Sequence, residues 1–136
     1  MSQENVEVVL EGVDALNRRD PDAFIGCVHP DVVWEVSGEV SPYLQGIYRG
    51  RAEVRGWFEK SVLEIWQSFH AEVEEITETN DGQVFLGVLV TARGRGSGVE
   101  LEARAWQVCW FADGKIARRQ LYLTRDEALE AAGLRE

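Results

Sequence analysis

The chain has 136 residues, 45% of them apolar and 28% charged, which is typical of a globular protein and too apolar for a disordered chain. This length predicts a single domain over residues 1–136. The 24 acidic residues outnumber the 14 basic ones and give a net charge of −10. Such a charge repels phosphate backbones and anionic lipid surfaces, so we expect no nucleic acid and no membrane among the partners.

Cysteine and histidine usage argues against a metal site. Cys27 and Cys109 are far apart in the sequence without a CxxC motif, and His29 and His70 are isolated. We therefore expect buried thiols, no metal, no cofactor and a reducing, cytoplasmic location. The first twenty residues carry several charges, and no apolar run approaches the length of a membrane span. The sequence thus predicts neither a signal peptide nor a membrane anchor.

Hydrophobic periodicity and turn signals predict the secondary structure. The expected elements in chain order are helices over 3–18 and 21–27, a strand over 31–37, a loop over 38–50, a helix over 51–66, strands over 69–78, 83–93, 98–111 and 115–124, and a final helix between Thr124 and Gly133. Ser2 is the expected N-cap of the first helix. Gly82 and Gly114 lie in hairpin signals, because glycine supplies the positive φ that such turns need. This order predicts an α+β fold with helices on one face of a curved, mostly antiparallel sheet.

Four segments carry a resemblance to a known family. They are residues 15–20 (ALNRRD), 29–34 (HPDVVW), 48–50 (YRG) and 110–116 (WFADGKI). In their order and spacing they resemble the SnoaL-like, or polyketide-cyclase-like, branch of the nuclear transport factor 2-like superfamily, over nearly the whole chain. The resemblance implies a cone-shaped fold that encloses one apolar pocket, and a homodimer formed through the outer face of the sheet.

The catalytic residues of the family's enzymes are absent from the matching positions. Ketosteroid isomerases in this superfamily use two tyrosines and two aspartates, where this chain has Gly12, Phe58, Val36 and Trp106. Polyketide cyclases and some epoxide hydrolases place an acid/base aspartate where this chain has Leu121. The resemblance therefore predicts that both standard acid/base layouts are missing and that ketosteroid isomerase activity is absent.

The resemblance also implies which strand residues face the pocket. These are Trp34 and Val36, then Arg104, Trp106, Val108 and Trp110, then Ala117, Arg119, Leu121 and Leu123. The candidate ligand-binding residues are Trp34, Tyr48, Trp57, Phe58, Arg104, Trp106, Trp110 and Arg119. Aromatic walls suit a flat apolar ligand, but the same tryptophans would also serve simply to fill the core. Both interpretations stay open at this point.

Arg104 and Arg119 are the most informative of these candidates. A guanidinium that faces inward needs a carboxylate partner or a ligand with a carboxylate or carbonyl group. The alternative is that the expected strand alternation is wrong by one residue, so that one or both arginines lie on the outer face. This alternative is strong for Arg119, because Arg118 is its neighbour and one of the two must point outward. The expected carboxylate partners are Glu35, Glu100 and Glu102.

Two hypotheses about function follow. The first is a domain that binds an apolar or aromatic small molecule with a carbonyl or carboxylate, with catalysis of the isomerase or cyclase type left open and Arg104 and Tyr48 as its candidate polarising groups. The alternative is a non-catalytic dimeric interaction protein with a filled pocket. Its expected outer face comprises Gln107, Cys109, Phe111, Gln120 and Tyr122.

Overall fold

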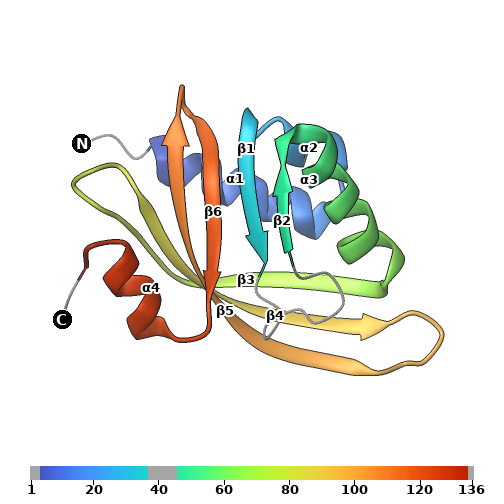
Figure 1. Ribbon diagram of the computed structural model, residues 1–136. Helices are drawn as coiled ribbons and strands as arrows, with labels where there is room; N and C mark the ends of the chain where they lie inside the picture. Colours follow the sequence, from blue (N-terminus) through green and yellow to red (C-terminus); the bar gives the residue numbers. More distant parts are fainter. Residues whose placement is uncertain (1–3, 37–45, 135–136) are drawn as a thin grey trace.

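The computed structural model describes residues 4–36 and 46–134 (Figure 1). Its elements are α1 (Glu4–Arg18), α2 (Pro21–Ile25), β1 (Val28–Val36), β2 (Gly46–Arg49), α3 (Gly50–Phe58), the π-helix η1 (Glu59–Glu64), β3 (Trp66–Glu78), β4 (Val84–Gly94), β5 (Glu100–Ala112), β6 (Lys115–Tyr122) and α4 (Arg125–Ala131). The expected N-cap Ser2 and most of the expected 38–50 loop lie outside the described residues.

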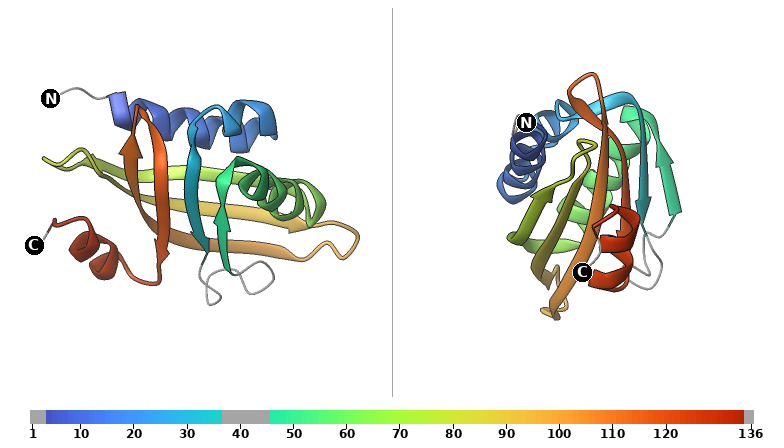
Figure 2. Two further views of the ribbon diagram at one scale, coloured as in Figure 1. Left: turned by 45° about the horizontal axis from the view of Figure 1, so that its top comes forward. Right: turned by 90° about the vertical axis from the view of Figure 1, so that its left-hand side faces the viewer.

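The strands form a six-stranded sheet in the order β2-β1-β6-β5-β4-β3. The β1–β6 pair is parallel, and the other neighbouring pairs are antiparallel. The first three helices lie along one face of this curved sheet, and the larger hydrophobic core fills the space between them (Figures 1 and 2). This arrangement confirms the expected α+β cone.

Helix α4 packs against the opposite face of the sheet (Figure 2). Its residues Ala128 and Leu129 form a second, smaller core cluster with Phe85 of β4 and Val108 of β5. Thr124 caps this helix, since its hydroxyl accepts a hydrogen bond of 3.1 Å from the backbone N–H of Glu127. Part of the outer sheet face is therefore covered within the chain itself.

The ALNRRD segment ties α1 to the edge of the sheet. The side-chain amide of Asn17 donates to the carbonyl of Ala71 (2.9 Å) and accepts from its N–H (2.8 Å), so it pairs with the exposed edge of β3 as a neighbouring strand would. The next residue but one, Arg19, donates from Nη2 to the carbonyls of Leu63 and Trp66, both at 3.1 Å. These bonds fix the helix layer over the sheet and hold the junction between η1 and β3.

Two local features differ from the sequence expectation. Strand β2 lies within the segment expected to be a loop and pairs with β1 through Trp34 and Tyr48. Such a short, largely exposed strand has no apolar alternation to reveal it, and it begins at Gly46 with φ of +140°. The helix expected over 51–66 becomes α3 followed by the π-helical turn η1, and β3 then begins earlier than expected at Trp66.

Candidate functional site

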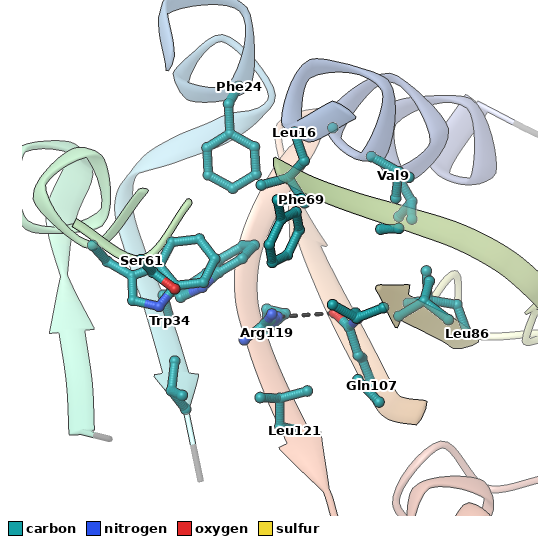
Figure 3. Close-up of a pocket in the computed structure, with 18 of the residues that line it drawn as sticks. Val9, Leu16, Phe24, Trp34, Ser61, Phe69, Leu86, Gln107, Arg119 and Leu121 are labelled. Carbon is teal, nitrogen blue, oxygen red and sulfur yellow. Dashed lines mark hydrogen bonds between the residues drawn. The ribbon is translucent and has the colours of Figure 1, made fainter. Parts of the chain in front are cut away.

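A cavity of about 270 Å³ lies between the helix layer and the inner face of the sheet (Figure 3). Its lining is mostly apolar and comes from every layer of the cone: Val9, Gly12, Val13, Leu16, Phe24, Trp34, Val36, Trp57, Ser61, Trp66, Phe69, Ala71, Leu86, Val88, Val90, Leu101, Ala103, Ala105, Gln107, Cys109, Ile116, Arg119 and Leu121. An enclosed apolar space with few polar groups is the usual form of a small-molecule site.

The space is open partly because several lining residues are small. Gly12 is buried in the middle of α1, and a Cβ built there would meet no atom within 4 Å beyond its chain neighbours and its own helix backbone. On the facing strand, Ala103 and Ala105 of β5 leave room where larger residues would close the cavity. Glycine at this position keeps the space open, although in a helix interior it is about 1 kcal/mol less stable than alanine.

Aromatic rings form one wall of the cavity. The rings of Trp34 and Phe24 meet edge to face at a centroid distance of 5.3 Å, and Trp34 and Trp57 are also 5.3 Å apart. Phe58 is fully buried behind them, 4.9 Å from Phe24, and does not line the cavity. Aromatic pairs at these distances stabilise each other and give the wall a fixed shape.

Arg119 of β6 is the charged group of the cavity lining, and only 6% of it is exposed. Its Nε donates to Oε1 of Gln107 (2.9 Å) and its Nη1 to the backbone carbonyl of Glu35 (3.2 Å). The guanidinium carbon lies 4.2 Å above the ring of Trp34 and 5.6 Å from that of Trp57. Both hydrogen-bond acceptors are neutral. Burial therefore lowers the pKa of Arg119 to about 10, with only a small opposing effect from Cys109.

Two further donors at this wall have no acceptor. The indole Nε1 atoms of Trp34 and Trp57 are buried and make no hydrogen bond to any described residue. Ser61 of η1, which is 9% exposed, adds a hydroxyl to the same lining. Buried donors are normally paired with protein or water, so these two are exceptions to that rule, and both belong to rings that line the cavity.

The described part of the cavity lining contains no aspartate, glutamate, histidine or tyrosine. Val36 and Leu121, where the sequence resemblance places the acid/base aspartates of the family's enzymes, line the cavity as apolar residues. Cys109 also lines it, but burial raises the pKa of its thiol to about 12, so it stays protonated and poorly nucleophilic at neutral pH. No three His, Cys, Asp or Glu side chains of residues 4–36 and 46–134 converge as metal ligands.

The structure brings together three of the eight candidate residues. Trp34, Trp57 and Arg119 line the cavity. Phe58 supports the aromatic wall from behind, and Tyr48 of β2 is half-buried and packs against the core without reaching the cavity.

The expected alternation of β5 is wrong by one residue. Arg104, Trp106 and Trp110 do not line the cavity, and the intervening positions, including Gln107 and Cys109, do. Side chains alternate along a strand, so a shift of one residue moves the whole set to the other face. Gly87 was the available signal: it pairs with Trp106 across the β4–β5 ladder, and a Cβ there would overlap the tryptophan ring. The bulky ring therefore covers the glycine on the outer face.

Arg104 takes part in an ion pair on that outer face. Its Nε and Nη2 donate to the two carboxylate oxygens of Glu74 at 2.9 and 3.3 Å, and its side chain is 56% exposed. The partner is thus Glu74 of β3 and not one of the three glutamates expected from the sequence. The same shift corrects the expected outer face, since Gln107 and Cys109 point inward and Phe111 packs against the inner core.

An α+β cone that holds an apolar cavity under its helices is the architecture of the nuclear transport factor 2-like superfamily. Within it, the chain belongs to the SnoaL-like domain family, whose model matches residues 9–119. This confirms the resemblance seen in the sequence. A search of curated proteins found no match. Among the described residues, no helix is long and apolar enough to cross a membrane.

Solved structures share the same fold at low sequence identity. Bal32a, from a soil-derived mobile gene cassette, is 22% identical with a TM-score of 0.78 over 88% of each chain. TerC, co-crystallised with polyporic acid, is 21% identical with a TM-score of 0.76 over 96% of this chain and 98% of that chain. A protein described as a putative polyketide cyclase from Sinorhizobium meliloti is 24% identical with a TM-score of 0.68, over 85% of this chain and 94% of that chain.

Proposed function

We propose that this SnoaL-like domain binds a small, planar and largely apolar molecule with a carbonyl or carboxylate group in the cavity under α1. The cavity itself is the observation that carries this proposal. It offers about 270 Å³ of space, its walls are apolar and aromatic, and its few polar groups lie around Arg119. A ligand of this kind would bury its rings against Trp34 and Trp57 and present its oxygen to the guanidinium.

The comparisons support the same ligand class. TerC, which shares the fold, was crystallised with polyporic acid, and another relative in fold is described as a putative polyketide cyclase. An open cavity also speaks against the alternative of an interaction protein with a filled pocket. We therefore favour ligand binding over a purely structural role.

Any reaction in this cavity would depend on polarisation by Arg119. A guanidinium aimed at a carbonyl oxygen stabilises the negative charge that develops there during isomerisation or cyclisation. The described lining supplies no carboxylate to move a proton. We accordingly propose that the domain binds its ligand, and that it catalyses a reaction only when the substrate needs a stabilised oxyanion and no base from the protein.

A thermal-shift screen with a plugged variant tests the proposal. Wild-type protein is heated with neutral and acidic naphthalene and anthraquinone derivatives, because a ligand that binds the native state raises its Tm. Gly12→Phe places a ring in the cavity, whereas Gly56→Phe places the same ring on the exposed side of α3. Ligands should shift the Tm of the wild type and of Gly56→Phe but not that of Gly12→Phe. Equal shifts in both variants, or none in the wild type, would contradict the proposal.

We also propose that the chain forms a homodimer through the outer face of β5 and β6, as the family resemblance implies. Trp110 and Tyr122 lie on this face, and Arg118 stacks over the ring of Trp110 at 4.6 Å. Trp110→Glu should then weaken the dimer. Sedimentation equilibrium that finds one 15.3 kDa species at micromolar concentration would contradict this.

We further propose a reducing, cytoplasmic location, because Cys27 and Cys109 are both buried and form no disulfide.

A further inference from the structure

We propose that the end of the cavity at Arg119 is a monoanion-binding site, and that the ligand is a planar aromatic compound carrying one carboxylate, enolate or phenolate oxygen group. This inference rests on the proposed function, since it names the ligand class for the same cavity. It goes beyond that function in requiring a charge on the ligand, which a neutral ketone or amide does not carry.

The charge of Arg119 is not neutralised within the described protein. Its hydrogen-bond acceptors are a side-chain amide, that of Gln107, and a backbone carbonyl, that of Glu35. The other titratable group that affects it is the thiol of Cys109, which stays neutral because burial raises its pKa to about 12. A buried cation without a counter-ion is costly, and a bound anion removes that cost.

The guanidinium also has donor capacity left. Arg119 carries five N–H groups, and the described residues take bonds from Nε and Nη1 only. Its two hydrogen bonds and the ring of Trp34, whose centroid is 4.2 Å from the guanidinium carbon, hold the group in position, and Figure 3 shows the bond to Gln107. The remaining donors of Nη2 are therefore held in one place while the residue lines the cavity. A carboxylate or enolate oxygen is the natural acceptor for such a fixed donor.

The indole N–H groups of Trp34 and Trp57 also favour a ligand group that accepts hydrogen bonds. Trp34 and Trp57 each bury an Nε1 donor that has no acceptor among the described residues, and their ring centroids lie 4.2 and 5.6 Å from the guanidinium carbon of Arg119. Three neighbouring side chains of the cavity lining thus carry donors that no described residue accepts from. Because none of them is an acceptor, this end of the cavity favours a ligand group that accepts hydrogen bonds only.

The rest of the molecule restricts the ligand to a single charge. One guanidinium balances one negative charge, and a second charge would lie unpaired against apolar residues such as Leu86 and Val88. The chain as a whole carries a net charge of −10, which repels polyanions at the surface. Phosphate esters and nucleotides are therefore disfavoured, and an aromatic monoacid that fits about 270 Å³ is favoured.

A pair of probes that differ mainly in charge tests this inference. Naphthalene-2-carboxylate and naphthalene-2-carboxamide have nearly the same shape, and their affinities are measured by isothermal titration calorimetry at pH 7. Wild-type protein should bind the carboxylate about 10- to 100-fold more tightly, as expected for a charge-assisted hydrogen bond. Arg119→Met should lose this preference and keep its affinity for the carboxamide. Arg118→Met is the matched control, because the neighbouring arginine stacks on Trp110 outside the cavity, and it should keep the preference.

The outcomes separate the inference from the proposed function. Equal affinities of the wild type for the two probes, or an unchanged preference in Arg119→Met, would overturn the monoanion site while leaving ligand binding intact. Binding of neither probe to the wild type, together with no Tm shift in the ligand screen, would overturn both. Arg119→Lys keeps the charge and is the second variant. It should retain part of the preference, and a preference as weak as that of Arg119→Met would count against a charge-based site.

Discussion

Gly12→Ala is the most direct perturbation of the cavity. Gly12 lies in the interior of α1, is buried, and has a negative φ that alanine adopts without strain. A Cβ at this position points into open space, because no atom beyond its chain neighbours and the backbone of its own helix lies within 4 Å of it. The substitution therefore adds a methyl group to the cavity without a clash and removes the entropic disadvantage of glycine in a helix.

The size of the effect follows from these contacts. Replacing glycine by alanine inside a helix contributes about 1 kcal/mol to the free energy of unfolding. The new methyl group makes no contact beyond its own helix, so tertiary packing neither adds to this value nor reduces it. For a chain of 136 residues the gain corresponds to a rise in Tm of roughly 4 °C.

Two other glycines are the controls in the same thermal melts. Gly56→Ala, on the exposed side of α3, should also raise Tm, because its Cβ also meets no atom. Gly87→Ala should lower stability by about 1–3 kcal/mol, because its Cβ would overlap the ring of Trp106. If Gly12→Ala lowers Tm while Gly56→Ala raises it, the space beside Gly12 is not open and the cavity as described is wrong.

Three further predictions concern charged and titrating groups. Arg104→Met should leave both Tm and ligand affinity nearly unchanged in melts and calorimetry, because the exposed ion pair with Glu74 lies outside the cavity; a loss of affinity would show that Arg104 reaches the ligand. The Cys109 thiol ionises near pH 9 in the unfolded chain but has a pKa of about 12 in the folded protein, so ionisation favours the unfolded state as the pH rises. Urea unfolding should therefore show that the wild type loses about 1 kcal/mol of stability between pH 8 and pH 10, a loss that Cys109→Ala does not show. At pH 7, Arg119→Met should raise the free energy of unfolding by about 1 kcal/mol, because it removes a buried charge that no acidic group among the described residues neutralises; a loss of several kcal/mol would instead indicate a carboxylate partner.

Much of the fold could be predicted from the sequence because local signals agreed with the final packing. The apolar spacing of α1, the proline that begins α2 and the Thr124 cap of α4 each specify an element without reference to the rest of the chain. Strand β2 could not be found this way, because it is only four residues long and is stabilised by pairing with β1. The π-helical turn likewise depends on tertiary bonds from Arg19 to Leu63.

The sequence predicted the site residues correctly only where the direction of a side chain did not depend on how neighbouring strands pair. Trp34 and Trp57 line the cavity because each lies on an element with a clear buried face. Strand β5 has apolar or small residues on both faces, one against the cavity and one against α4, so alternation alone does not distinguish them. In β6 the residues that face the cavity are Ile116, Arg119 and Leu121, so the regular alternation is interrupted between Ile116 and Arg119. The β5–β6 register shifts by one residue at this point. A shift of this kind is set by pairing across strands and leaves no mark in one strand's sequence.

Three features that weaken the fold occur together at the cavity, and this coincidence argues for a binding site. A glycine at position 12 reduces helix stability, an open space of about 270 Å³ forgoes packing, and Arg119 buries a charge that no acidic group among the described residues pairs with. Each would be removed by a simple substitution, such as alanine or leucine at position 12 or methionine at position 119, without altering any other element. Local rules of stability are commonly broken where a protein meets its ligand. A bound aromatic monoanion would resolve the last two at once, because its rings would fill the space and its charge would neutralise the guanidinium.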